Sequence, residues 1–346
     1  MANIILPPDW TIPENRATPP AIYWNRRSFV KKLGVGLAAA GVAGCGVGGG
    51  SGQGRNEGGG GGTAGPVPDG PLDTIPETPT RELYPGDRDP RFTLDRPLTD
   101  REVAATYNNF YEFMTDKDAV WRHTGPFQAR PWTVEVSGEV DRGGTFDVAD
   151  LEREFGLEER LYRFRCVEAW AMAVPWTGFP MEKLIRKVEP LSSARYVRFI
   201  TFYRPDEAIG QREQDWYDWP YYEGLRMDEA LNELTFVATG IFGEPLPKQH
   251  GAPIRMVLPW KYGFKSPKSV VRMEFTRERP RTFWSDLTPN EYGFYSNVNP
   301  AVPHPRWSQE TEEMIGEDLR RDTLVHNGYG EWVAHLYDEE VMSRIS

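Results

Sequence analysis

The sequence contains two cysteines, Cys45 and Cys166, and the second is the more informative residue for chemistry. It lies in the aromatic segment RFRCVEAWAMAVPWTGFP, residues 163–180, two positions before Glu168. Three roles fit a solitary thiol: an inert buried side chain, a nucleophile paired with a histidine from elsewhere in the chain, or a thiolate ligand of a metal. One cysteine cannot hold a metal alone, so the third role requires a cofactor that supplies the other ligands.

The neighbours of this thiol favour a reactive role. Arg163 and Arg165 precede it, and nearby cations stabilise a thiolate. In a regular strand Glu168 would share its face, because side chains repeat every two residues, and a carboxylate beside a redox metal can carry protons. We therefore take Cys166 and Glu168 as candidate catalytic residues, with Cys166 as the candidate metal ligand.

The balance of charge argues against nucleic acid as a partner. The 346-residue chain has 40 Lys and Arg against 51 Asp and Glu, a formal net charge of −11, and it has no basic cluster that could neutralise phosphates. Two cysteines cannot form a disulfide framework. The motifs HExxH, CxxC and GxxxxGKS/T are absent and the five histidines are scattered, so neither a three-histidine zinc site nor a P-loop is indicated.

The first 44 residues resemble an export signal. Arg26 and Arg27 begin the pattern R-R-x-F-x-K, and a short, weakly apolar run follows over residues 33–44. This pattern is typical of the twin-arginine (Tat) signals that export folded proteins to the periplasm, although an ordinary basic leader can also contain two arginines. The run ends in VAGC, which resembles a bacterial lipobox and predicts lipidation of Cys45; an incidental cysteine near a cleavage site is the alternative.

The rest of the chain divides into a linker and a catalytic domain. We expect a signal peptide over 1–44, a Gly- and Pro-rich linker and extended segment over 45–100, and one catalytic domain over 101–346. The Pro- and Asp-rich residues 66–100 are expected to cover the surface without regular structure. A flexible linker after an acylated cysteine would tether the domain to a membrane surface.

Periodicity predicts a chain of strands with short helices between them. Alternating or β-rich patterns predict strands at 132–140, 160–174, 194–204, 233–242, 253–260 and 269–279. Helices are predicted at 147–155, with Asp147 or Asp150 as N-cap, and after Pro180. Because strands and helices do not alternate as βαβ units, the predicted fold class is α+β.

A longer similarity supports the metal hypothesis. RCVEAWAMAVPWTGFP resembles the molybdenum-binding core of the sulfite-oxidase superfamily, and within it the catalytic subunits of the bacterial periplasmic protein-methionine-sulfoxide reductases. Further segments resemble that family in the same order: TYNNFYEF (106–113), PWTVEVSGEV (131–140), LEERLYRFRCVEAW (157–170), EGLRMDEAL (223–231), GAPIRMVLPWKYGFKS (251–266), TRERPRTFW (276–284), EYGFYSNVNP (291–300) and HPRWSQ (304–309). The resemblance extends from about residue 100 to the C-terminus, and it implies a molybdopterin-binding α+β fold of mixed sheets.

The resemblance also implies a cofactor and its ligands. Molybdenum would be bound by the dithiolene of one molybdopterin, with Cys166 as the only protein ligand. By position, the cofactor-binding residues would be Asn108, Tyr111, Glu112, Thr201, His250, Arg255, Ser266, Pro267 and Lys268. Arg255 and Lys268 suit a phosphate as guanidinium fork and ammonium. The family has Asn before GAP where this chain has His250, whose imidazole can still hydrogen-bond a pterin.

The implied activity is removal of oxygen from methionine sulfoxide residues of exported proteins. The enzyme would be a monomeric catalytic subunit that receives electrons from a haem-containing membrane subunit. Two alternatives stay open. A sulfite-oxidase-type enzyme acting on a small sulfur oxyanion or another S-oxide would need several arginines at the metal, for which Arg163, Arg165 and Arg255 are available. A non-catalytic lipoprotein that binds a partner through aromatic side chains is the other.

Lipidation of Cys45 can be tested by metabolic labelling with a fatty-acid analogue. We expect wild-type protein and a Cys166→Ser variant to carry label, and a Cys45→Ser variant to lose it, because only the lipobox thiol is a substrate for acylation. Label retained by Cys45→Ser would contradict the prediction.

Overall fold

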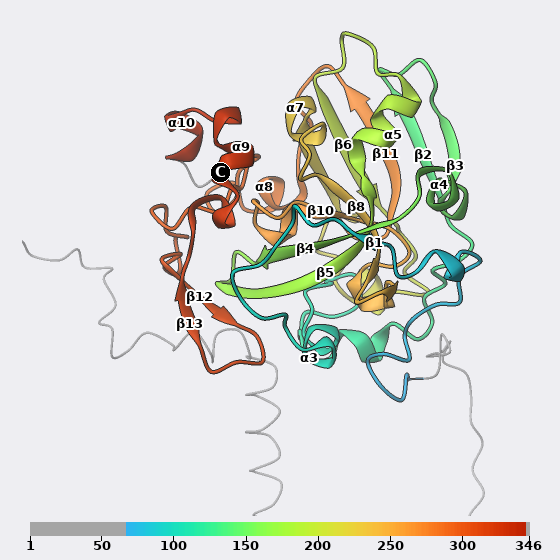
Figure 1. The fold of residues 1–346 in the computed structure, drawn as a ribbon, viewed down its shortest axis with the longest axis horizontal. Coiled ribbons are helices and arrows are strands. Elements are labelled where there is room, and N and C mark those ends of the chain that lie inside the picture. Colours follow the sequence, from blue (N-terminus) through green and yellow to red (C-terminus); the bar gives the residue numbers. More distant parts are fainter. Residues whose placement is uncertain (1–66, 344–346) are drawn as a thin grey trace, which may run out of the picture. The chain divides into compact units, whose positions relative to one another are not determined.

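The computed structural model describes residues 67–343 (Figure 1). The export signal and Cys45 lie outside the described residues. The strands are β1 (Asp87–Arg88), β2 (Thr133–Gly138), β3 (Gly144–Asp147), β4 (Glu158–Arg165), β5 (Trp170–Pro180), β6 (Tyr196–Thr201), β7 (Tyr222–Arg226), β8 (Phe236–Ile241), β9 (Glu244–Pro245), β10 (Arg255–Val257), β11 (Val270–Thr276), β12 (Thr311–Met314) and β13 (Arg320–Asp322). The α-helices are α3 (Arg101–Thr106), α4 (Val148–Phe155), α5 (Met181–Val188), α6 (Ile209–Glu213), α7 (Met227–Ala230), α8 (Phe283–Leu287), α9 (Gly330–Val333) and α10 (Glu339–Met342).

Two mixed sheets organise these elements. In the first, β4 and β8 pair antiparallel with β5, and β12 pairs parallel with it. The second sheet has the order β3-β2-β11-β6-β7, with β2 and β11 parallel. Every residue of β5 except its last is buried, as expected for a central strand covered on both faces. Mixed sheets joined by short helices confirm the predicted α+β class (Figure 1).

The two predicted helices form where their local signals indicate. Helix α4 begins after Asp147, whose side chain accepts hydrogen bonds from the backbone N–H groups of Ala149 at 2.8 Å and Asp150 at 3.3 Å. Asp147, and not Asp150, is therefore the N-cap, which satisfies donors that have no partner inside the helix. Helix α5 begins directly after Pro180 and buries Met181, Leu184, Ile185 and Val188 along one side.

The predicted continuous strand at 160–174 is wrong. Strand β4 ends at Arg165, and β5 begins at Trp170 and returns antiparallel to it. Between them Cys166 to Ala169 form a turn, in which the Ala169 N–H donates to the Cys166 carbonyl at 3.1 Å. Cys166 and Glu168 are thus turn residues and do not share a strand face.

The segment before residue 101 is more regular than predicted. A 3-10 turn, η2 (Arg81–Leu83), is followed by β1, which pairs parallel with the start of β4. Tyr84 Oη also reaches into the domain and donates to Glu152 at 3.0 Å. These contacts attach the segment to the first sheet.

None of the helices within residues 67–343 is long and hydrophobic enough to cross a bilayer.

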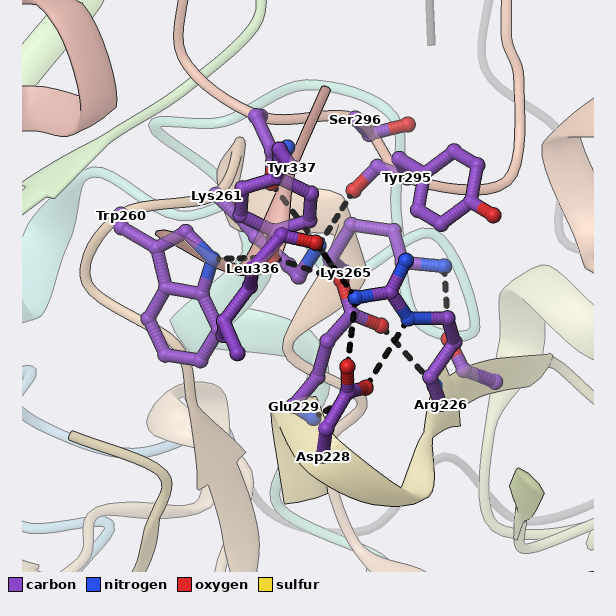
Figure 2. A network of polar contacts seen from close by, with 12 residues as sticks. Arg226, Asp228, Glu229, Trp260, Lys261, Lys265, Tyr295, Ser296, Leu336 and Tyr337 are labelled. Carbon is purple, nitrogen blue, oxygen red and sulfur yellow. Dashed lines mark hydrogen bonds and ion pairs between the residues drawn. The ribbon is translucent and has the colours of Figure 1, made fainter. Parts of the chain in front are cut away.

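A buried ion pair fixes the loop that follows β10 (Figure 2). The Lys261 ammonium donates to Glu229 of α7 at 2.6 Å and to Asn297 at 2.9 Å, and both charged side chains are at most 1% exposed. Tyr337 Oη donates to the same Glu229 carboxylate at 2.7 Å and accepts from Trp260 Nε1 at 2.8 Å. Burial raises the pKa of Glu229, but the charge of Lys261 and the hydrogen bonds from Lys261, Tyr337 and the Arg226 backbone together outweigh it, so the pKa lies below its usual value and the carboxylate is ionised. One carboxylate thereby joins α7, the loop and the C-terminal segment.

Removal of one partner of this pair should destabilise the domain strongly. We expect Lys261→Met to lower the free energy of unfolding by about 3–5 kcal/mol, because Glu229 would remain buried without its counter-charge. Urea unfolding followed by circular dichroism measures the change. The control is Glu182→Gln, since the Glu182–Arg186 pair is exposed at 41% and 76% and should contribute less than about 1 kcal/mol. Equal losses in the two variants would contradict the argument.

Candidate active site

One cleft collects most of the predicted site residues. It encloses about 970 Å³ free of protein atoms, its open mouth included. Its lining comes from residues 107–112, from the β4–β5 turn, from residues 250–268 and from aromatic side chains of later segments. Of the predicted residues, the following line it: Cys166, Glu168, Asn108, Tyr111, Glu112, His250, Arg255, Ser266, Pro267 and Lys268.

Thr201 is the exception. Its side chain does not line the cleft. Its hydroxyl instead donates at 3.4 Å to the carboxylate of Glu112, which does line the cleft. Asn108 lines the cleft, and its side-chain amide donates to the Ala105 carbonyl at 2.9 Å.

Distant parts of the chain hold the turn that carries Cys166. Trp307 Nε1 and Gln309 Nε2 each donate to the Val167 carbonyl at 2.7 Å. The Arg165 guanidinium donates to the Cys166 carbonyl, and it is itself paired with Glu312 at 3.1 Å. Ala169 has a φ of 67°, in the left-handed region that a residue with a side chain rarely adopts. The turn is therefore imposed by its surroundings rather than by its own sequence.

The Cys166 sulfur points into the cleft beside a carboxylate and an amide. Its Sγ lies 3.7 Å from Glu168 Oε2 and 3.4 Å from Asn109 Nδ2, and the Glu168 backbone N–H lies 3.5 Å away. Burial, with Glu168 adding to it, raises the pKa of the thiol to about 12. No histidine within residues 67–343 hydrogen-bonds the sulfur, so the cysteine–histidine pair of a nucleophilic thiol is not formed among these residues.

Glu168 is the centre of a small polar network at the cleft. Its Oε2 accepts from Asn109 Nδ2 at 2.8 Å and from Trp170 Nε1 at 3.2 Å, and it lies 3.3 Å from the Lys117 ammonium. The side chain of Glu168 is 25% exposed, so this carboxylate can exchange protons with water. Asn109 and Lys117 were not predicted. Asn109 is next to Asn108 in the YNNFYE segment, whereas no sequence signal marks Lys117.

The cleft is also lined by two cationic side chains, Arg255 and Lys268. Arg255 is 2% exposed, and its Nη2 has no hydrogen-bond partner among the described residues. The Lys268 ammonium makes no hydrogen bond within that part of the chain and lies 5.2 Å from the centre of the Phe110 ring. Burial lowers the pKa of Lys268, with Arg255 adding to the effect and Glu112 opposing it. Burial and these two cations lower the pKa of His250 to about 3, so its imidazole is neutral.

These groups fit an anionic cofactor with a soft metal. A buried guanidinium with a free donor and a neighbouring ammonium match a phosphate. No cluster of three or more His, Cys, Asp or Glu able to hold a metal occurs within residues 67–343, so Cys166 would be the single protein ligand and the cofactor would supply the rest.

Comparison with known proteins identifies the family of this chain. Residues 123–284 match the family model described as the oxidoreductase molybdopterin binding domain. The chain is 44% identical over 330 residues to a Burkholderia mallei protein named protein-methionine-sulfoxide reductase catalytic subunit MsrP, with 94% of this chain and 93% of the relative covered. The solved structure of the sulfane dehydrogenase SoxCD from Paracoccus pantotrophus is similar with a TM-score of 0.43 and 14% identity; the match covers 63% of this chain and about half, 53%, of the other. On the identity and coverage shared with the Burkholderia relative, the chain belongs to the family of protein-methionine-sulfoxide reductase catalytic subunits.

Proposed function

We propose that the protein is a molybdopterin-dependent reductase of methionine sulfoxide residues in exported proteins. One observation carries the proposal: the same cleft is lined by the Cys166 sulfur, by Lys268 and by the buried guanidinium of Arg255, whose Nη2 has no partner among the described residues. The family membership supports it, because the relative's name states this activity.

The reaction consumes two electrons and two protons. A sulfoxide becomes a thioether, and its oxygen leaves as water. When bound, the molybdenum cofactor supplies the two-electron chemistry that takes oxygen from sulfur. The chain's own residues must hold the cofactor, deliver protons and position the sulfoxide.

Each of these tasks has candidate residues in the cleft. Cys166 Sγ would hold the metal, and Arg255 with Lys268 would hold the phosphate of the pterin. Glu168 would carry protons at Oε2, which Asn109 and Lys117 keep directed toward the sulfur. The remaining predicted residues would hydrogen-bond the pterin, with Thr201 acting through Glu112.

Location and electron supply are part of the same proposal. The Tat-like signal over 1–44 and the linker over 45–100 would place the catalytic domain in the periplasm. A lipid at Cys45 would keep the enzyme near a haem-containing membrane subunit and raise its effective concentration there. A single catalytic subunit then suffices on the periplasmic side.

The sulfite-oxidising alternative receives less support. That activity would need Arg163, Arg165 and Arg255 around a small anion, but of these three only Arg255 lines the cleft. Arg165 is fully buried against Glu312 and Gln309, and Arg163 lies against Tyr329 and 3.7 Å from Asp95. Steady-state rates with sulfite and with methionine sulfoxide separate the two activities.

Cys166→Ala tests the proposed activity. We expect wild-type holoenzyme with a chemical electron donor to reduce methionine sulfoxide and to oxidise sulfite at least tenfold more slowly, and the variant to lose the reduction because its metal ligand is absent. Elemental analysis should find molybdenum in the wild type. A wild-type protein that lacks molybdenum after expression in a molybdenum-replete host would contradict the proposal.

Arg255→Gln and Lys268→Met test cofactor binding without relying on activity. A charge-assisted hydrogen bond contributes about 1.5–3 kcal/mol, so each variant should bind the cofactor roughly ten- to a hundredfold more weakly. The molybdenum and pterin contents of purified protein report the loss. Arg272→Gln is the matched control, since Arg272 is 44% exposed and lies outside the cleft. Full molybdenum content in both cleft variants would exclude this role.

A further inference from the structure

The rim of the cleft carries an exposed tryptophan. Residues 214–220 connect α6 to β7 and read QDWYDWP. Trp219 of this loop lines the cleft, whereas Trp216 is 60% exposed. A tryptophan this exposed leaves a large apolar surface in water, which in soluble proteins often marks a binding site.

Aromatic contacts connect Trp216 with the cleft. The Trp216 ring lies 5.8 Å from that of Tyr217, which lies 5.4 Å from Trp219. Tyr217 also lies 6.4 Å from Tyr111 and 6.2 Å from Trp284, and both of these line the cleft. We call Trp216, Tyr217 and Trp219 the aromatic ledge; it continues the cleft wall outward to the surface.

Hydrogen bonds hold the ledge in place. The Gln214 carbonyl accepts from Trp219 Nε1 at 3.1 Å and from the Tyr217 backbone N–H at 3.2 Å. The Gln214 side-chain amide donates to the Tyr111 carbonyl at 2.8 Å, and Gln214 is buried. The loop is thus anchored to the cleft wall itself. A fixed aromatic surface loses little conformational entropy when a ligand binds.

The chemistry of the substrate indicates what covers this ledge. A methionine sulfoxide within a polypeptide can enter the cleft only if the residues on either side of it cross the rim. Asp215 and Asp218 lie on either side of Trp216 and Tyr217 in the chain, and both are exposed. Apolar or aromatic residues would pack on Trp216, and basic residues would be favoured beside the carboxylates. An anionic lipid surface would be repelled by the same carboxylates.

We propose that the aromatic ledge binds the residues flanking methionine sulfoxide in extended polypeptides and favours apolar and basic neighbours. This inference rests on the proposed reductase activity and adds a basis for choosing among polypeptides. Trp216 acts on substrate binding and makes no contact with the cofactor residues described above.

The test compares a peptide with a small substrate on the same holoenzyme. The peptide carries methionine sulfoxide between phenylalanines with lysines at its ends, and the small substrate is N-acetylmethionine sulfoxide. We expect Trp216→Ala to lower kcat/KM for the peptide about tenfold, through KM, because the peptide loses the apolar surface of an aromatic anchor. The rate with the small substrate should change less than twofold, and Trp216→Phe should retain most of the peptide rate. Leu191→Ala is the control for an exposed apolar side chain, since Leu191 is 45% exposed and lies outside the cleft.

The outcomes separate this inference from the proposed function. If wild-type enzyme reduces both substrates and Trp216→Ala does too at unchanged rates, the ledge has no role in substrate binding. An equal loss of kcat/KM on both substrates would show that Trp216 maintains the structure of the cleft and does not bind the polypeptide. That result would also overturn the inference. A loss of binding to anionic vesicles with unchanged peptide kinetics would assign the ledge to a membrane surface. If wild-type holoenzyme reduces neither substrate, the proposed function itself fails.

Discussion

The direction in which the Cys166 sulfur points depends on the hydrogen bonds that two backbone carbonyls of the β4–β5 turn accept. The turn from Cys166 to Ala169 contains a residue in the left-handed region, a conformation that costs about 1–3 kcal/mol for a residue with a side chain. Arg165 bonds the first carbonyl of the turn, and Trp307 and Gln309 bond the second. These bonds offset the strain, because any relaxed turn would leave buried polar groups without partners. The sulfur therefore faces the cleft for reasons that lie outside the turn.

The cleft combines two environments that a single small ligand could not satisfy. Around Cys166 the groups are a carboxylate, an amide and indole rings, whereas Arg255 and Lys268 contribute cations, of which Arg255 is buried. An unpaired donor such as Arg255 Nη2 destabilises the protein when no ligand is present, since a buried charged donor without a partner is costly. A ligand that carries both a phosphate and a metal would supply a partner for the Arg255 donor and for the Cys166 sulfur. Binding of such a cofactor should add directly to the stability of the folded domain.

Two buried ion pairs hold the loop that carries Ser266 and Lys268. The Lys261 ammonium pairs with the buried carboxylate of Glu229 in α7 (Figure 2). The Lys265 ammonium pairs with the buried carboxylate of Glu223 in β7, so both pairs attach the loop that carries Ser266 and Lys268. Rigid supports of this kind reduce the entropy lost when the loop's donors engage a ligand.

Local patterns in the sequence predicted the two longest helices and several of the longer strands, but only part of the site. Strands β2, β6, β8 and β11 and helices α4 and α5 follow from period-two and capping signals, because those depend on nearby residues. The turn at Ala169 was missed because no Gly, Pro or Asn marks it, and RLYRFRCVEAWAMAV therefore reads as one strand. The similarity to a known family supplied Arg255 and Lys268, whereas Lys117 was found only from the structure. Its contact with Glu168 joins residues 51 positions apart, and no spacing rule connects them.

The two hydrogen bonds to the Val167 carbonyl also have a consequence for biosynthesis. Trp307 and Gln309 follow the turn by 140 and 142 positions. A chain synthesised only as far as β11 contains the thiol, Arg255, Lys268 and the second sheet, but not β12, β13 or these two restraints on the turn. The turn that positions the thiol is therefore completed only when residues 307–309 have been made, well after the thiol itself.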